Sequence, residues 1–99
     1  MENLNKDNIK IKEVIKNKKL LYGEYINVAN LTMIFINLLE SRPAWSSFDS
    51  CTKLAFIKIV NKIARLVCGR LHEESLIDIQ EYIQLILDNS NNIIKKENN

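Results

Sequence analysis

Three basic side chains repeat along one stretch of the sequence at a spacing that suits the binding of an anion. Lys58, Lys62 and Arg65 stand at positions i, i+4 and i+7, and residues at these intervals share one face of an α-helix. Arginine can bind a phosphate through two parallel hydrogen bonds, and lysine adds charge. The stripe has three interpretations: a solvated face, an internal layer of ion pairs, or an anion site. The sequence leaves all three open.

An acidic and an aromatic side chain on the next segment form the other half of this candidate site. Asp78 and Tyr82 are also four residues apart. A chain reversal near residues 71–72 is predicted to set Arg65 opposite Asp78, and Lys62 opposite Glu81 and Tyr82. In the ion-pair interpretation Arg65 holds Asp78 and the tyrosine donates its hydroxyl. Such pairing offsets the cost of desolvating the charges without necessarily adding stability.

Two further aromatic residues could stack on a base. Tyr22 stands at the start of a predicted helix, and Trp45, the only tryptophan, lies in a loop that ends at Phe48. In one interpretation Trp45 covers the end of a helical bundle, and in the other its ring is available to a ligand. The candidate ligand-binding residues are therefore Lys58, Lys62, Arg65, Asp78, Tyr82, Tyr22 and Trp45.

The motifs of several enzyme classes are missing. His72 is the only histidine, so the chain lacks the second histidine that a helical zinc site needs. There is no CxxC, P-loop or GxGxxG motif, and we predict no catalytic residue, no metal and no cofactor. Helical magnesium-dependent pyrophosphohydrolases hold their cations with clustered carboxylates. A partial echo of that cluster is formed by Glu73, Glu74, Asp78 and Glu81.

The cysteines and the apolar segments indicate a cytoplasmic protein. Cys51 and Cys68 fall on one predicted helix, about 25 Å apart. A disulfide requires Cα atoms within about 7 Å, so an intrachain bridge is excluded and a reducing compartment is expected. The first residues contain no apolar signal segment. The longest apolar stretch, residues 28–39, contains three polar residues and is too short to span a bilayer.

Composition and periodicity predict a single all-α domain over residues 1–99. A hydrophobic content of 46% with 26% charged residues is typical of globular proteins, and a net charge of +2 disfavours a nucleic-acid binder. No segment alternates with a period of two for long enough to form a strand. We expect a compact bundle of about four helices, of which the third and fourth form an antiparallel hairpin.

The helix boundaries follow from caps and breakers. Gly23 can end a turn or permit a close backbone approach, and Pro43 stops the second helix. Ser75 and Asp78 have the spacing of a capping box. Residues 1–7 and 90–99 are expected to be frayed. The four predicted helices begin near residues 7–8, 22, 49–50 and 75, and end near residues 18, 41, 69 and 89.

The second predicted helix is apolar around most of its circumference. Tyr22, Ile26, Ala29, Met33 and Ile36 form one stripe, and further apolar residues widen it. A helix of this kind must be buried inside a bundle or in an oligomer. Four helices of this size cannot cover it fully, and uncovered apolar patches mark interfaces. We therefore predict a homo-oligomer.

Three separated motifs occur in order along the chain. They are Lys19-x-x-Tyr22-Gly23, then Lys-Ile-Ala-Arg-Leu at residues 62–66, then a segment from His72 through Ile77-Asp78-Ile79 to Tyr82. In these motifs the chain resembles an uncharacterised family of small tailed-phage proteins, whose members read roughly R-x-x-x-Y-G, K-x-A-R-L and H-x-D-x-x-x-D-x-x-G-Y. The resemblance covers about residues 15 to 87. It implies a phage origin and a helical fold, and no activity.

Small phage proteins without enzymatic motifs commonly act by binding. We expect a phage-encoded counter-defence protein that sequesters a nucleotide-type immune signalling molecule, such as a cyclic nucleotide, in a homo-oligomer in the host cytoplasm. The alternative is a protein–protein inhibitor of a host defence complex such as a CRISPR effector. A degenerate all-α nucleotide pyrophosphohydrolase is the second alternative, if the four carboxylates named above converge.

Overall fold

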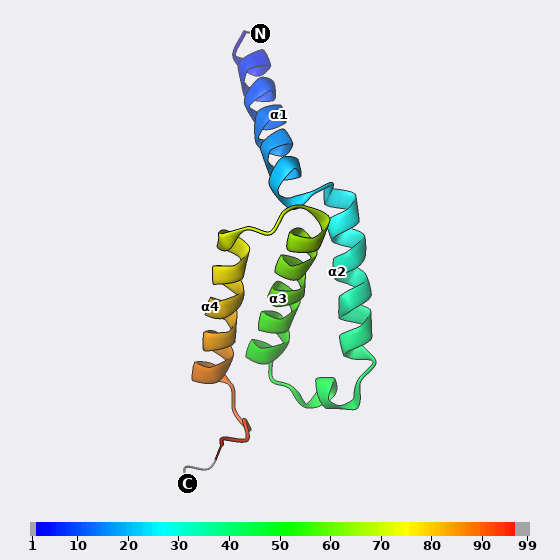
Figure 1. Ribbon diagram of the computed structural model, residues 1–99, viewed down its shortest axis with the longest axis vertical. Coiled ribbons are helices and arrows are strands. Elements are labelled where there is room, and N and C mark those ends of the chain that lie inside the picture. Colours follow the sequence, from blue (N-terminus) through cyan, green and yellow to red (C-terminus); the bar gives the residue numbers. More distant parts are fainter. Residues whose placement is uncertain (1, 97–99) are drawn as a thin grey trace.

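The computed structural model describes the backbone of residues 2–96 and the side chains of residues 8–96. It contains α1 (Glu2–Tyr22), α2 (Tyr25–Glu40), the 3-10 helix η1 (Pro43–Ser47), α3 (Ser50–Cys68) and α4 (Glu73–Asn89) (Figure 1). No strand occurs in this part of the chain, and the predicted all-α fold is confirmed. Met1 and residues 97–99, which the prediction assigned to frayed termini, lie outside the described residues.

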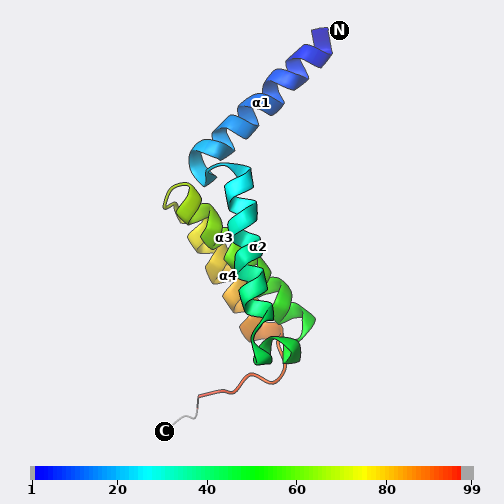
Figure 2. The same cartoon turned by 90° about the vertical axis from the view of Figure 1, so that its right-hand side faces the viewer.

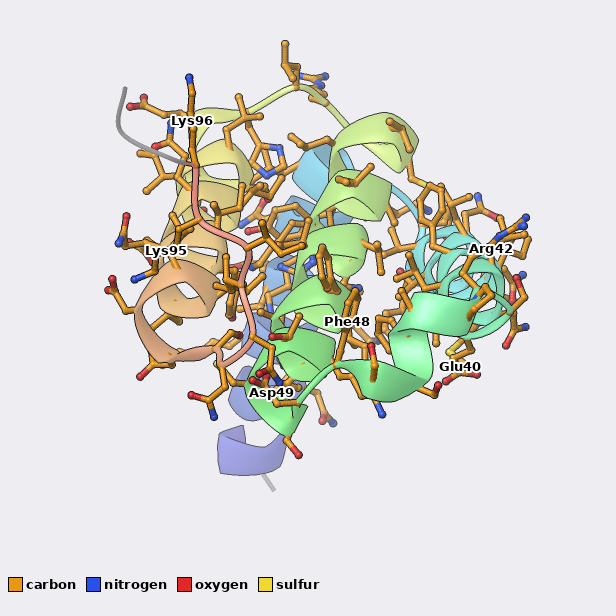
Figure 3. All side chains as sticks on the ribbon, turned by 90° about the horizontal axis from the view of Figure 1, so that it is seen from below. Glu40, Arg42, Phe48, Asp49, Lys95 and Lys96 are labelled. Atoms are coloured by element: carbon orange, nitrogen blue, oxygen red, sulfur yellow. The ribbon has the colours of Figure 1, made fainter. Side chains whose placement is uncertain are left out.

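Three of the helices form one layer, and the fourth projects from it. Seen from below, α4, α3 and α2 stand in a row with α3 in the middle (Figure 3). α1 leaves the edge of this layer at which α2 begins and α3 ends, and it points away from the layer (Figure 2). The Cα radius of gyration is 17.7 Å, whereas a compact chain of this length would have about 13 Å. The chain is therefore elongated, with extents of 65 × 28 × 25 Å.

The hairpin of α3 and α4 is confirmed. Thr52, at the start of α3, hydrogen-bonds Ser90, just after the end of α4. At the other end, Lys62 reaches Asp78, so the two helices run antiparallel. α3 supplies most of the core because it is contacted from both sides. The buried apolar residues are Val28, Ala55, Ile59, Val60 and Ala64.

Both glycines lie where the end of α1 touches the end of α3. Gly23 has φ +87°, a left-handed conformation that other residues rarely adopt. A Cβ there would collide with the carbonyl oxygen of Cys68, and a Cβ on Gly69 would collide with that of Leu21. The Arg70 amide donates to the same Leu21 oxygen at 2.9 Å. The close approach predicted for Gly23 is confirmed, and it fixes the corner from which α1 departs.

Three predicted helix starts are wrong. α2 begins at Tyr25 and not near Tyr22, because α1 continues past the predicted end at Lys18 and includes Tyr22 in its last turn. α1 begins at Glu2 and not at residue 7 or 8, so the helix includes most of the segment expected to be frayed. α4 begins at Glu73 and not at Ser75, with His72 in the N-cap position. Glu73 and Glu74 then occupy the first turn, where the helix dipole favours negative charge. Ser75 lies inside the helix, and the predicted capping box is not formed.

The start of α3 was predicted correctly. The Asp49 carboxylate accepts from the Thr52 amide at 2.8 Å, as an N-cap aspartate does. Its other oxygen accepts from the Asn91 amide at 3.1 Å, which ties the segment after α4 to this end of the layer. The backbone hydrogen bond from Thr52 is the main reason that the pKa of Asp49 is lowered.

No helix within the described residues is both long and apolar enough to cross a membrane.

Candidate functional site

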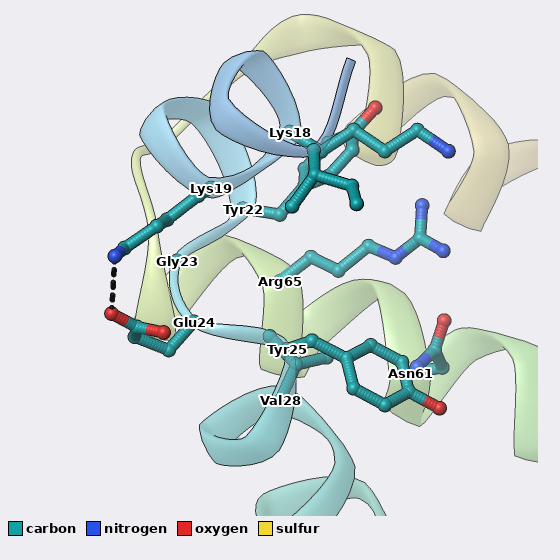
Figure 4. Close-up of a pocket in the computed structure, with 10 residues that line it drawn as sticks. Lys18, Lys19, Tyr22, Gly23, Glu24, Tyr25, Val28, Asn61 and Arg65 are labelled. Carbon is teal, nitrogen blue, oxygen red and sulfur yellow. Dashed lines mark ion pairs between the residues drawn. The ribbon is translucent and has the colours of Figure 1, made fainter. Parts of the chain in front are cut away.

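A pocket of about 510 Å³ opens where α1, α2 and α3 meet (Figure 4). Tyr22 enters it from the last turn of α1, and Tyr25 from the first turn of α2. Asn61 and Arg65 enter from α3, where a spacing of four residues places them on one face. The volume falls within the range of about 300–1,000 Å³ that small-molecule sites occupy. The pocket is therefore large enough for a small organic ligand.

Arg65 is the central cation of this pocket. Its guanidinium carbon lies 4.8 Å from the centroid of the Tyr22 ring, which is a cation–π contact. Within the part of the chain that the structure describes, Arg65 forms no ion pair. Its charge is balanced only by the face of the tyrosine ring. A half-buried guanidinium in this state can accept an anionic group from a ligand.

The predicted pair of Arg65 with Asp78 is wrong, because Lys62 takes that partner. The Lys62 ammonium lies 2.9 Å from an Asp78 carboxylate oxygen, and 15% and 26% of the two side chains are exposed. Three residues turn a helix by about 300°, so positions 62 and 65 point about 60° apart. That angle directs Lys62 toward α4 and Arg65 toward α1. The ion-pair interpretation therefore fits Lys62, and the anion-site interpretation fits Arg65.

The remaining predicted site residues do not line this pocket. Lys58 is exposed on α3, and Tyr82 is half-buried on α4. Trp45 lies at the opposite end of the layer, in η1, where its ring centroid is 6.0 Å from that of Phe48 and 6.4 Å from that of Phe56. The Trp45 side chain therefore covers the end of the bundle, which was one of its two interpretations. It cannot stack on a ligand held by Arg65.

Tyr22 contacts three charged or polar side chains, one on α3 and two at the start of α4. Its hydroxyl donates to Glu74 at 3.3 Å, and its ring centroid lies 5.2 Å from that of His72. The contact with Arg65 ties the end of α1 to α3. The contacts with Glu74 and His72 tie it to the start of α4. The tyrosine is thus oriented by the fold before any ligand arrives.

His72 and Ser75 form a hydrogen-bonded pair at the start of α4. The Nδ1 atom of His72 lies 2.6 Å from the Arg70 carbonyl oxygen, so Nδ1 carries the hydrogen because a carbonyl only accepts. Nε2 then accepts from the Ser75 hydroxyl. Ser75 is only 1% exposed. This pair organises the first turn of α4, and both ring nitrogens of His72 have a hydrogen-bond partner.

The carboxylates of α4 go to separate partners. Glu74 accepts from Tyr22, and Asp78 binds Lys62. Among residues 8–96 no three His, Cys, Asp or Glu side chains approach closely enough to hold a metal ion. The convergence on which the pyrophosphohydrolase alternative depends is therefore not seen there.

Among the lining residues of the pocket that the sequence analysis missed, three could contact a ligand. Lys18 lies four residues before Tyr22 and Asn61 four residues before Arg65, while Tyr25 opens α2. The i, i+4 spacing of the first two pairs was available in the sequence. Only the crossing of α1 over α3, set by the two glycines, brings the pairs together.

None of the protein-family models, curated proteins or solved structures matches this chain. The chemistry of the pocket therefore carries the functional reasoning, beside the three motifs that resemble those of a tailed-phage family.

Proposed function

We propose that this protein binds a small anionic ligand with an aromatic ring, of the nucleotide class, and acts by withholding it. The pocket between α1, α2 and α3 is the proposed site. One observation carries the proposal: the Arg65 guanidinium lines this pocket, lies against the Tyr22 ring at 4.8 Å, and has no carboxylate partner among the described residues. A phosphate is the group that best complements such a guanidinium.

Of the other two cations of the pocket, Lys19 forms an ion pair, and Lys18 forms none with the side chains of residues 8–96. The Lys18 side chain extends to the same side of the pocket as Arg65 (Figure 4). Lys19 is turned to the opposite side, where its ammonium lies 2.7 Å from Glu24. Lys18 and Arg65 together offer two positive charges to one group. A phosphate or a cyclic phosphodiester would bridge them.

An aromatic base could stack on the wall of the pocket that Tyr25 forms. Tyr25 lines the pocket although 85% of the residue is exposed, and an exposed aromatic ring beside a cationic site offers a stacking surface. The Asn61 amide nitrogen donates to Thr32 at 3.3 Å, which leaves the amide oxygen as an acceptor for the edge of a base. Cations on one wall and a ring on the other match the two ends of a nucleotide.

The biological setting of the proposal comes from the motif resemblance. A small tailed-phage protein that holds a nucleotide in the host cytoplasm would act as a counter-defence protein by sequestering an immune signalling molecule. Self-association belongs to the same proposal and is supported by the apolar side chains that α2 leaves exposed. Ile26, Met33, Ile34 and Leu38 are each more than half exposed.

Those apolar side chains also favour a second candidate function. A contiguous exposed apolar surface on a small chain can dock on another protein, as an inhibitor of a host defence complex would. The two candidates differ in the partner: the first requires a small molecule in the pocket, and the second requires a host protein on α2.

The deciding experiment is heat release of small molecules from protein purified out of cells with active nucleotide signalling, followed by mass spectrometry. We expect a nucleotide from the wild type and from Lys58→Ala, and none from Arg65→Ala. Lys58 is a matched control because it is a cation of the same helix outside the pocket. A folded wild type that releases no nucleotide and binds none of a panel of cyclic nucleotides in calorimetric titration would overturn the proposal.

A further inference from the structure

Charge is divided unequally between the first and the last helix. Between residues 8 and 22, α1 carries five lysines and one carboxylate, whereas α4 carries five carboxylates and no lysine or arginine. Only Lys19 of these lysines and only Asp78 of these carboxylates take part in an ion pair within the described residues. Within one chain α1 projects away from the layer that contains α4 (Figure 1). The lysines of α1 and the carboxylates of α4 therefore do not pair within one chain, as far as the structure describes it.

α1 also exposes a line of apolar side chains that it cannot cover itself. Ile11, Val14 and Ile15 are each more than half exposed and, at spacings of three and four, share one face. We call these three residues the α1 seam. Lys10 and Lys12 flank it on either side. Most of a helix's stability in a protein comes from packing of its apolar face, so a helix that projects in this way needs a partner for the seam.

α4 presents an exposed surface that also contains apolar side chains and carries the opposite charge. Ile77 and Leu85 lie on its outer side and are 42% and 47% exposed. Glu81 and Asp88, seven residues apart, alternate with them along the same line of the helix and are exposed. We call these four residues the α4 strip. Apolar residues flanked by charges are the usual contact surface between two helices, in which the flanking charges select the partner.

The accessible surface of the chain is larger than that expected for a compact monomer of the same mass. Its accessible surface is 8108 Å², about 2,300 Å² more than the roughly 5,800 Å² expected for a compact monomer of 11.5 kDa. A standard stable interface covers about 800 Å² on each partner. Two such contacts on each chain, one on α1 and one on α4, would cover about 1,600 Å², which is most of this excess.

We infer that two copies of this chain associate with the α1 seam of each lying along the α4 strip of the other. The contact is the same on both copies, as a two-fold axis requires. Lys10 and Lys12 then face Glu81 and Asp88 of the second copy. The pocket, whose wall includes Ile15 of the seam, comes to lie against the partner's α4. The inference rests on the self-association put forward above but assigns the contact to α1 and α4, so that the exposed apolar side chains of α2 lie outside it. It does not depend on the ligand.

The first test mixes unlabelled and ¹⁵N-labelled full-length chains and couples lysines to carboxylates with a zero-length carbodiimide. We expect peptides that join Lys10 or Lys12 of one label to Glu81 or Asp88 of the other. An oligomer whose cross-links avoid α4, or occur only within one label, overturns this arrangement and leaves self-association standing. A light-scattering mass near 11.5 kDa overturns both, even if the monomer still binds a nucleotide.

The second test reverses the charges. Lys10→Glu with Lys12→Glu, and separately Glu81→Lys with Asp88→Lys, should each weaken self-association by about tenfold, and an equimolar mixture of the two variants should regain most of it. Lys95→Glu with Lys96→Glu makes the same charge change in the segment after α4 and should have no effect. Equal weakening by this control, or a mixture no stronger than its components, would contradict the proposed contact.

Discussion

At the end of the layer where α3 begins, the aromatic and polar side chains find their partners within the chain. Trp45, Phe48 and Phe56 contact one another, with 5.7 Å between the centroids of the two phenylalanine rings, and Asp49 holds two backbone amides. At the other end Arg65 lies against the Tyr22 ring and forms no ion pair with the side chains that the structure describes, and Tyr25 is almost fully exposed. The side chains of the first region are satisfied by contacts within the chain. Those of the second region are available to bind a ligand.

This difference shows how to separate a structural group from a functional one. Both regions contain aromatic rings and charges at helical spacing, so residue type does not distinguish them. What distinguishes them is whether a partner in the chain already satisfies each polar group. The variants below test the contrast, from the largest expected effect to the smallest.

Trp45→Ala should destabilise the protein without affecting the pocket. Removal of a large aromatic ring from a cluster costs about 3–5 kcal/mol when the ring is fully buried, and because Trp45 is only half-buried we expect about 2–3 kcal/mol. Chemical denaturation measures the loss, and nucleotide titration of the folded fraction should be unchanged. If the titration instead loses its signal in folded protein, the two regions are not independent.

Arg65→Ala should weaken nucleotide binding and change the stability of the fold only slightly. Loss of a charge-assisted contact to phosphate costs about 1.5–3 kcal/mol of binding, or roughly ten- to a hundredfold in affinity. The fold should lose only about 0.5–1 kcal/mol, the value of an exposed cation–π contact. Calorimetric titration and thermal melting of one preparation separate the two quantities. A loss of about 3–5 kcal/mol in stability would instead indicate a carboxylate left unpaired by the change.

Lys62→Met should weaken the contact between α3 and α4 by about 1 kcal/mol. The substitution keeps the length of the side chain and removes the charge that faces Asp78 at 2.9 Å. The pair is partly exposed, so much of its attraction is screened by solvent. Denaturation of the single variant and of Lys62→Met with Asp78→Asn measures the pair. Recovery in the double variant identifies an internal ion pair, and a loss of nucleotide binding by the single variant would contradict that assignment.

The smallest effect is the pH dependence that Asp49 contributes. Its pKa is lowered in the folded state, chiefly by the hydrogen bond from the Thr52 amide, so its contribution to stability is present above the unfolded pKa of about 3.9 and is lost as the pH falls through the folded pKa. The advantage of the wild type over Asp49→Asn should therefore shrink below about pH 4. Melting temperatures measured across this range check the sign, and a growing advantage would contradict it.

The sequence was sufficient for most of the fold. Stripes of apolar residues with a period near 3.6 predicted four helices, Pro43 the end of the second and Asp49 the start of the third, because caps, breakers and periodicity are local properties. It was not sufficient where two local signals competed. Ser75 and Asp78 have capping-box spacing, but Glu73 and Glu74 suit the first turn of α4 as well, and the helix begins there.

For the site, the sequence determined which residue types were available, and the tertiary structure decided which of them meet. That Lys58, Lys62 and Arg65 share one face of a helix follows from their spacing alone. The division of this stripe into an exposed residue, an ion pair with Asp78 and a pocket cation depends on where α1 and α4 lie around α3. That placement is set by backbone contacts at Gly23 and Gly69, between segments more than forty residues apart. Helical periodicity carries no information on contacts so distant, because any crossing angle between two helices preserves it.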